Sequence, residues 1–193
     1  MKKVLVALSL GLAVVSNPAQ AATFNEVESN DTLGTAQSLG SLDTANAVNA
    51  SRIGDSSADY YSFSLNAGDT VTFETATPGS VGDTVIAFYG LGQNLLALND
   101  DGPVFPASAL SFTVASAGTY YLGVGDFGDI NYDGNGTITS LTGDVFAGGG
   151  DSYSYTLNIG IVPQTVPEPT SMTGMLLLGL GGIATRYKKR RNH

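Results

Sequence analysis

Residues 59–75 read DYYSFSLNAGDTVTFET and predict two β-strands joined by a turn. Apolar and polar side chains alternate along residues 59–65 and again along residues 70–75. Alternation with a period of two is typical of a strand that buries one face. The linking residues 66–69, Asn-Ala-Gly-Asp, have the composition of a turn, so the pair is interpreted as a β-hairpin.

The same pattern continues through the middle of the chain, where short runs of Val, Ile, Phe, Tyr and Thr are separated by Gly, Asn, Asp and Ser. Seven or eight strands with turn signals between them predict an all-β fold, an antiparallel β-sandwich. One helical turn near residues 32–39, capped by Asn30 or Asp31, is a further expectation. The remaining strands are expected at residues 84–89, 94–99, 109–114, 119–124 and 153–161.

The composition excludes much of the familiar catalytic machinery. The chain has no cysteine, which excludes disulfides, thiol nucleophiles and cysteine-ligated metals. The only histidine is the last residue, His193, so neither a Ser-His-Asp triad nor a multi-histidine metal site is expected inside a folded body.

The charges are segregated along the chain. Between the basic ends, the 17 acids less Glu168 leave sixteen against Arg52, a net charge of −15 for residues 22–166. Such a body repels nucleic acid and attracts cations, and it is equally compatible with an acidic surface that only keeps the protein soluble. No nucleic-acid partner is therefore expected.

Both ends have the features of targeting signals. Residues 1–21 combine two lysines, an apolar run and the small residues Ala19 and Ala21, which predicts a secretory signal helix removed by signal peptidase. Residues 163–193 contain Val166-Pro167-Glu168-Pro169, a short apolar helix and a basic tail. This order resembles the PEP-CTERM sorting signal of Gram-negative bacteria, which implies processing by an exosortase and transient anchoring in the inner membrane. An ordinary tail anchor is the alternative.

The body, residues 22–162, resembles the bacterial pre-peptidase C-terminal (PPC) domain, a family that includes collagen-binding domains of collagenases. The resemblance implies a jelly-roll-like, non-catalytic sandwich that in some members binds calcium and an extracellular polymer. The segments that carry it are EVESNDT at 26–32, DYYSF at 59–63, AGDTV at 67–71, NDDG at 99–102, FTV at 112–114, AGTYYL at 117–122 and YTL at 155–157.

The sequence NEVESND at residues 25–31 places four oxygen-bearing side chains close together: Glu26, Glu28, Asn30 and Asp31. Calcium prefers six to eight such oxygen ligands, and in an extended segment Glu26, Glu28 and Asn30 would point to one side. The resemblance adds Asp59 as a ligand. It also implies an Asp at position 56, where this chain has Ser56 with Asp55 beside it. The alternative is an acidic linker with a helix cap.

A weaker metal candidate consists of Asp129, Asn131 and Asp133, which copy the opening of an EF-hand-like loop. The copy then fails, because position twelve is Ser140 rather than a bidentate Glu. Residues 125–150 are therefore expected to form a surface loop that is more often inert. Exposed Tyr60, Tyr120 and Tyr153 are a possible polymer-binding face, although half-buried packing is the commoner role.

These patterns together predict a non-enzymatic, exported protein at the cell surface or in the extracellular matrix, with a calcium-stabilised sandwich that binds a polysaccharide or matrix protein. Two alternatives stay open. One is a small secreted hydrolase, or an accessory domain of a hydrolase system, that uses carboxylates. The other is a passenger body that only accompanies the sorted tail.

Overall fold

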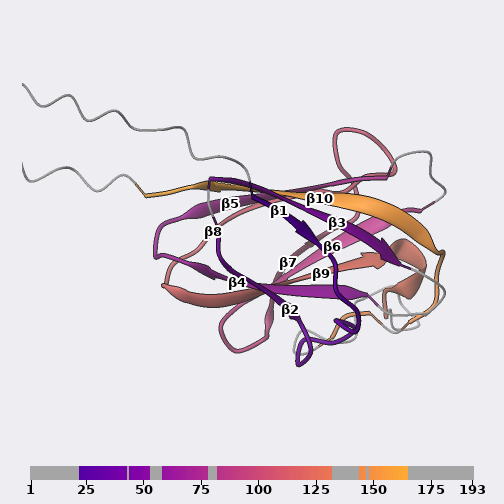
Figure 1. The fold of residues 1–193 in the computed structure, drawn as a ribbon, viewed down its shortest axis with the longest axis horizontal. Coiled ribbons are helices and arrows are strands. Elements are labelled where there is room, and N and C mark those ends of the chain that lie inside the picture. The colour runs from indigo at the N-terminus through magenta and orange to yellow at the C-terminus, as the bar shows by residue number, and fades with distance from the viewer. Residues whose placement is uncertain are drawn as a thin grey trace, which may run out of the picture. The chain divides into compact units, whose positions relative to one another are not determined.

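The structure is a computed structural model that describes residues 22–42, 44–52, 58–77, 82–131, 144–146 and 148–164. Two five-stranded sheets face each other (Figure 1), one in the order β1-β3-β10-β5-β8 and the other in the order β2-β4-β9-β6-β7. The strands are β1 (Ala22–Asn25), β2 (Gln37–Ser41), β3 (Ala45–Arg52), β4 (Asp59–Leu65), β5 (Thr70–Ala76), β6 (Thr84–Tyr89), β7 (Leu95–Asn99), β8 (Ala109–Thr113), β9 (Gly118–Asp126) and β10 (Tyr153–Val162), with a 3-10 turn η1 (Phe127–Asp129) after β9.

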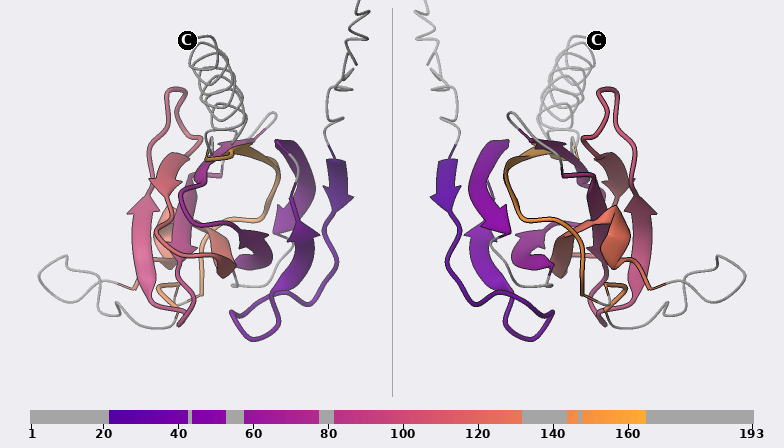
Figure 2. Two further views of the ribbon diagram at one scale, coloured as in Figure 1. Left: turned by 90° about the vertical axis from the view of Figure 1, so that its left-hand side faces the viewer. Right: turned by 90° about the vertical axis from the view of Figure 1, so that its right-hand side faces the viewer.

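The predicted β-sandwich is confirmed, with ten strands among the described residues instead of seven or eight. Most neighbours pair antiparallel, as in β3 with β10 and β4 with β9. The exceptions are the edge strands β1 and β2, which pair parallel with β3 and β4. Because β1 and β2 are consecutive in the chain, the N-terminal segment contributes an edge to each sheet (Figure 2).

The hairpin predicted at residues 59–75 is wrong. β4 pairs with β2 and β9, whereas β5 pairs with β10 and β8 in the opposite sheet. Residues 66–69 therefore cross from one sheet to the other, held by hydrogen bonds from Asn66 N to Asp69 Oδ2 (2.8 Å) and from Gly68 N to Val114 O (2.8 Å). The alternating pattern identified both strands correctly. However, β4 and β5 do not pair in one sheet, and their apolar faces meet across the core.

The helical turn expected near residues 32–39 is also wrong. Residues 32–35 form a single turn in which Thr35 N donates to Thr32 O (3.0 Å), and residues 37–41 form strand β2. Strands β1 to β3 escaped prediction because their sequences are rich in Ala, Asn and Ser, which are weak strand formers.

Aromatic side chains from both sheets fill the core between them. Phe88 of β6 lies 5.3 Å from Phe73 of β5 and 5.5 Å from Tyr120 of β9, measured between ring centroids. Phe63 of β4 lies 5.8 Å from Phe73. Rings at these separations add roughly 0.5–1.5 kcal/mol per pair beyond the area that they bury.

The sheet that contains β4 and β6 is buried on both faces. Its outer face carries a second apolar cluster that includes Tyr60, Tyr89 and Leu33, and it is covered by Val145 and Phe146 from the segment expected to be an inert surface loop. Val145 and Phe146, which belong to the described part of residues 125–150, thus complete a second core. The three tyrosines considered for a polymer-binding face are all buried, with exposures of 0%, 4% and 7%: Tyr60, Tyr120 and Tyr153.

The structure divides into two units, residues 1–163 and residues 164–193. The predicted signal peptide with Ala19 and Ala21, the motif Val166–Pro169 and the apolar stretch predicted after it lie outside the described residues. Within the described part of the chain, no helix is both long and apolar enough to cross a bilayer. The domain bounds 1–21, 22–162 and 163–193 stay predictions.

Candidate functional site

The segment between β1 and β2 passes from one sheet to the other and positions the acidic motif. Glu26 continues the pairing of β1, with its N–H donating to Asn49 O (3.0 Å). The side chain of Gln37 holds the two ends of the crossing together, since its amide donates to Asn25 O (3.0 Å) and its oxygen accepts from Val27 N (2.9 Å). The motif is thus fixed to both sheets by hydrogen bonds.

Glu26 is the centre of a group of polar side chains that we call the Glu26 cluster: Glu26, Asn30, Asp59, Tyr61 and Tyr155. One carboxylate oxygen of Glu26 accepts from Ser51 N (2.7 Å). The other accepts from Asn30 Nδ2 (3.3 Å) and from the Tyr61 hydroxyl (3.2 Å). The cluster joins the N-terminal segment to strands of both sheets.

Asp59 begins β4 and lies in the interior, with an exposure of 2%. Its carboxylate accepts from the Tyr155 hydroxyl (2.7 Å), which lies 2.8 Å from the Tyr61 hydroxyl. Burial of the carboxylate, followed by repulsion from the negative charge of Glu26, raises the pKa of Asp59 to about 8. The protein therefore keeps two carboxylates together where their charges are poorly compensated.

The donors of the Glu26 cluster fit a hard cation. Asn30 is 1% exposed, and its Oδ1 atom is buried without a hydrogen-bond partner. Carboxylate and amide oxygens are ligands that calcium prefers, and a cation would satisfy Asn30 Oδ1 and lower the repulsion between Glu26 and Asp59. Among the described residues no group of three His, Cys, Asp or Glu side chains comes together, so the cluster depends on two carboxylates and one amide.

The structure brings together three of the six predicted ligands, Glu26, Asn30 and Asp59. Glu28 is exposed and shares with Glu26 a groove of about 500 Å³ that opens beside β3 and β10. Asp31 is half-buried next to Asn30. Asp55 lies outside the described residues.

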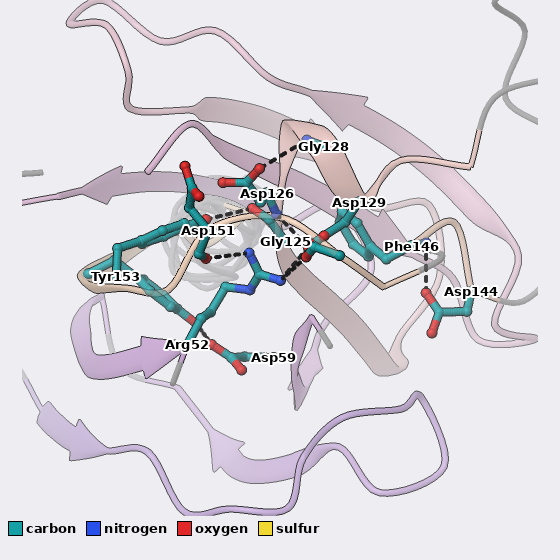
Figure 3. A network of polar contacts seen from close by, with 12 residues as sticks. Arg52, Asp59, Gly125, Asp126, Gly128, Asp129, Asp144, Phe146, Asp151 and Tyr153 are labelled. Carbon is teal, nitrogen blue, oxygen red and sulfur yellow. Dashed lines mark hydrogen bonds and ion pairs between the residues drawn. The ribbon is translucent and has the colours of Figure 1, made fainter. Parts of the chain in front are cut away.

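A second polar group, missed by the sequence analysis, surrounds the buried guanidinium of Arg52 (Figure 3). We call it the Arg52 cluster: Arg52, Asp126, Asp129 and Tyr153. Arg52 pairs with Asp129 and donates to the backbone oxygens of Gly149 (3.3 Å) and Asp151 (3.3 Å). Its guanidinium also lies 5.5 Å from the centre of the Tyr153 ring. The isolation of Arg52 among acids was visible in the sequence, but its partner was not.

The two described residues of the weaker metal candidate have different surroundings. Asp129 is wholly buried beside Arg52, whereas Asn131 is exposed and Asp133 lies outside the described residues. Burial raises the pKa of Asp129, while a backbone hydrogen bond and Arg52 act in the opposite direction. The EF-hand-like loop stays a prediction.

These features define the class of protein as an all-β sandwich domain with a polar cluster at the junction of its two sheets. Residues 57–126 match the family model of the bacterial pre-peptidase C-terminal domain. Residues 165–191 match the PEP-CTERM protein-sorting motif. Both resemblances are thereby confirmed: residues 57–126 are similar to a PPC domain, and the PEP-CTERM signal implies an exported protein. Neither match is to a catalytic family, and residues 26–31 lie outside both.

Solved structures with similar chains include the following three proteins. The pre-peptidase C-terminal domain of a Bacillus anthracis collagenase is 16% identical over 74% of this chain and 99% of its own, with a TM-score of 0.42. PliG of Aeromonas hydrophila, a periplasmic inhibitor of g-type lysozyme, is 13% identical over 74% and 98%, with a TM-score of 0.39. CorA of Methylomicrobium album BG8, a surface-associated copper-binding protein, is 13% identical over 66% and 98%, with a TM-score of 0.41. No curated protein sequence matches the chain significantly.

Proposed function

We propose that this protein is a non-catalytic binding or structural protein of the cell surface or extracellular matrix, whose sandwich is stabilised by a calcium ion held by Glu26, Asn30 and Asp59. The observation that carries the proposal is that Glu26 contacts Asn30 and interacts with Asp59, while Asn30 Oδ1 is buried without a hydrogen-bond partner. Calcium would supply the positive charge that the two carboxylates lack.

The residues of the Glu26 cluster explain what such an ion would stabilise. Glu26 and Asn30 belong to the crossing between β1 and β2, whereas Asp59 belongs to β4. An ion bound by all three would fasten the crossing to the sandwich, in addition to the hydrogen bond from Tyr60 N to Asn30 O (2.9 Å). In a chain without cysteine, this would replace a covalent crosslink.

A thermal melt of the full-length protein with calcium and with a chelator tests the proposal. Calcium at a thousand times its dissociation constant adds about 4 kcal/mol to the free energy of unfolding, which corresponds to a rise in Tm of about 10 °C. The Glu26→Gln variant should lose most of this rise. Glu74→Gln makes the same charge change at an exposed site on β5 and should retain it.

An equal Tm with calcium and with chelator would remove calcium from the proposal. Loss of the rise in Glu74→Gln as well as in Glu26→Gln would show that calcium acts through general charge instead of at the Glu26 cluster. The hydrolase alternative receives no support from the cluster, because Asp59 is buried and a substrate has no access to it.

The part of the proposal that concerns sorting rests on the PEP-CTERM match at residues 165–191. An exosortase-type enzyme is the partner that the PEP-CTERM match implies. We infer transient anchoring of residues 172–184 in the inner membrane of a Gram-negative bacterium, followed by release to the surface or beyond. A glycan and matrix-protein array, probed with the purified protein, would identify the polymer or show that the body is a passenger.

A further inference from the structure

The outer face of the sheet that contains β3, β10, β5 and β8 carries almost no charge. On these four strands, Glu74 is the only charged side chain that points outward. The other outward residues are Ala, Gly, Ser, Thr and Asn, with one valine, Val162, at the end of β10. Soluble surfaces are typically about 25–35% Lys, Arg, Glu and Asp, so this face is depleted of charge although the body as a whole is strongly acidic.

The short side chains leave this face hollowed. A groove of about 600 Å³ crosses all four strands and reaches Pro103 in the loop before β8. The groove of about 500 Å³ beside Glu26 continues it along β3 and β10. The two grooves occupy successive positions on this pair of strands, since Asn49 pairs with Thr156 in one and Ala47 pairs with Asn158 in the other. We call them together the sheet trough. Residues 45–51 of β3 border it over roughly 20 Å.

The side chains that line the sheet trough suit a hydroxyl-rich ligand. Asn49, Asn158, Thr72 and Ser111 are exposed, and each has atoms that can donate and atoms that can accept a hydrogen bond. Glu74, which pairs with Asn158 across β5 and β10, adds an acceptor. These side chains are short, so fixing them on binding costs less conformational entropy than fixing Lys or Arg. Sugar hydroxyls need this mixture of donors and acceptors.

Charge and anchoring groups distinguish among polymers. A polyanion would be repelled by the net charge of −15 on residues 22–166. A protein partner usually needs aromatic or other large side chains as anchors, and no outward residue of β3, β5, β8 or β10 is aromatic. A long, uncharged, hydroxyl-rich chain meets neither obstacle.

We propose that the sheet trough binds a neutral polysaccharide. The proposal rests on the binding function proposed above and names the class of its partner. It is independent of the calcium site, because most of the trough lies on strands that contribute nothing to the Glu26 cluster. Ser111 in particular belongs to β8, the edge strand opposite β1 in this sheet, so its substitution leaves the Glu26 cluster intact.

Native gel electrophoresis of the full-length protein in gels that contain dextran, galactomannan or the anionic polysaccharide alginate tests the proposal. At least one neutral polysaccharide should retard the protein, and alginate should not. Ser111→Arg places a long side chain in the trough and should lower the affinity about tenfold. Ser64→Arg makes the same change at an exposed position on β4, in the other sheet, and should retain binding. A gel without polysaccharide corrects for the added charge.

The absence of retardation by either neutral polysaccharide would overturn the proposal, and so would equal retardation of Ser111→Arg and the unaltered protein. Binding to collagen instead, blocked by Ser111→Arg, would show that the trough receives a protein. The calcium-dependent rise in Tm is measured separately, so loss of that rise together with retained retardation would reject calcium and support the trough.

NMR of the unaltered protein locates the site without any variant. Addition of oligosaccharides from the polysaccharide that retards the protein should shift the amide signals of Asn49, Thr72 and Asn158, and the signal of Ser64 should stay in place. Shifts confined to the other sheet would overturn the placement of the site in the trough.

Discussion

The guanidinium of Arg52 and the carboxylate of Asp129 form an ion pair in which both side chains are wholly buried, although 77 residues separate them in the chain. The positive charge of Arg52 also lowers the pKa of Asp59, against the larger effects of burial and of Glu26. Arg52 thus acts on both the Arg52 cluster and the Glu26 cluster (Figure 3). The only basic residue between the two ends of the chain serves as an internal counter-ion.

Breaking this pair should strongly destabilise the protein. Arg52→Met leaves Asp129 as an uncompensated buried charge, and we expect a loss of about 3–5 kcal/mol in the free energy of unfolding. Urea unfolding measures this loss. Arg52→Met combined with Asp129→Leu should recover part of it, because neither charge is then left buried. A double variant as unstable as the sum of the single ones would contradict the coupling.

The stability of the calcium-free protein should fall as the pH rises from about 4 to 8. The pKa of Asp59 is about 8 in the folded protein and roughly 3.9 in the unfolded chain, so in this window the folded state holds one more proton. The slope is at most about 1.4 kcal/mol per pH unit. Urea unfolding at a series of pH values measures it.

Asp59→Asn is the matched variant for this pH dependence, since it removes the titrating group and retains the size of the side chain. Its stability should vary less between pH 4 and 8, and calcium should no longer raise it. A slope as steep in Asp59→Asn as in the unaltered protein would assign the titration to another group.

The core should be sensitive to loss of the central aromatic ring. Phe88 is wholly buried and contacts rings from both sheets, so Phe88→Ala should cost about 3–5 kcal/mol. Phe105, 74% exposed on the β7–β8 loop, provides the control, and Phe105→Ala should change stability by less than about 0.5 kcal/mol. Similar losses for the two variants, measured by urea unfolding, would show that Phe88 is not central to packing.

Replacement of Pro167, Glu168 and Pro169 by alanine should abolish processing of the tail in a host that has an exosortase. The extended, accessible conformation that prolines impose would be lost together with the acidic residue. Immunoblotting of cell fractions would detect the longer, unprocessed chain. Alanine at the flanking Thr165 and Thr170 should leave maturation normal, and normal maturation of the triple variant would reject the sorting motif.

The sequence-based prediction was most successful where the signal is local. Alternation identified β4 and β5 because each strand has one face in the core. It failed at β3, whose inward residues include Asn46 and Arg52, polar side chains that the alternation rule assigns to solvent. It also failed at the hairpin, since turn composition at residues 66–69 does not specify which sheet the next strand joins.

The candidate site shows the same contrast between local sequence signals, which were predicted, and contacts between distant residues, which were not. Glu26, Asn30 and Asp59 were predicted from the acidic motif together with the family resemblance, and the fold brings them into one cluster. The Arg52 cluster was not predicted, because it depends on the burial of Asp126 and Asp129 and on the ion pair between Arg52 and Asp129. Neither feature has a sequence signature.

By itself the sequence determined the all-β class, the PEP-CTERM sorting signal, the PPC resemblance and the absence of cysteine and histidine chemistry, because composition, alternation and short motifs are properties of neighbouring residues. Only the tertiary structure decided that β4 and β5 face each other across the core, that Tyr61 and Tyr155 connect Glu26 with Asp59, and that Arg52 meets Asp129. Those contacts join residues from distant strands, and strand pairing, which is a competition among many nearly equivalent partners, is settled only when the whole core is buried.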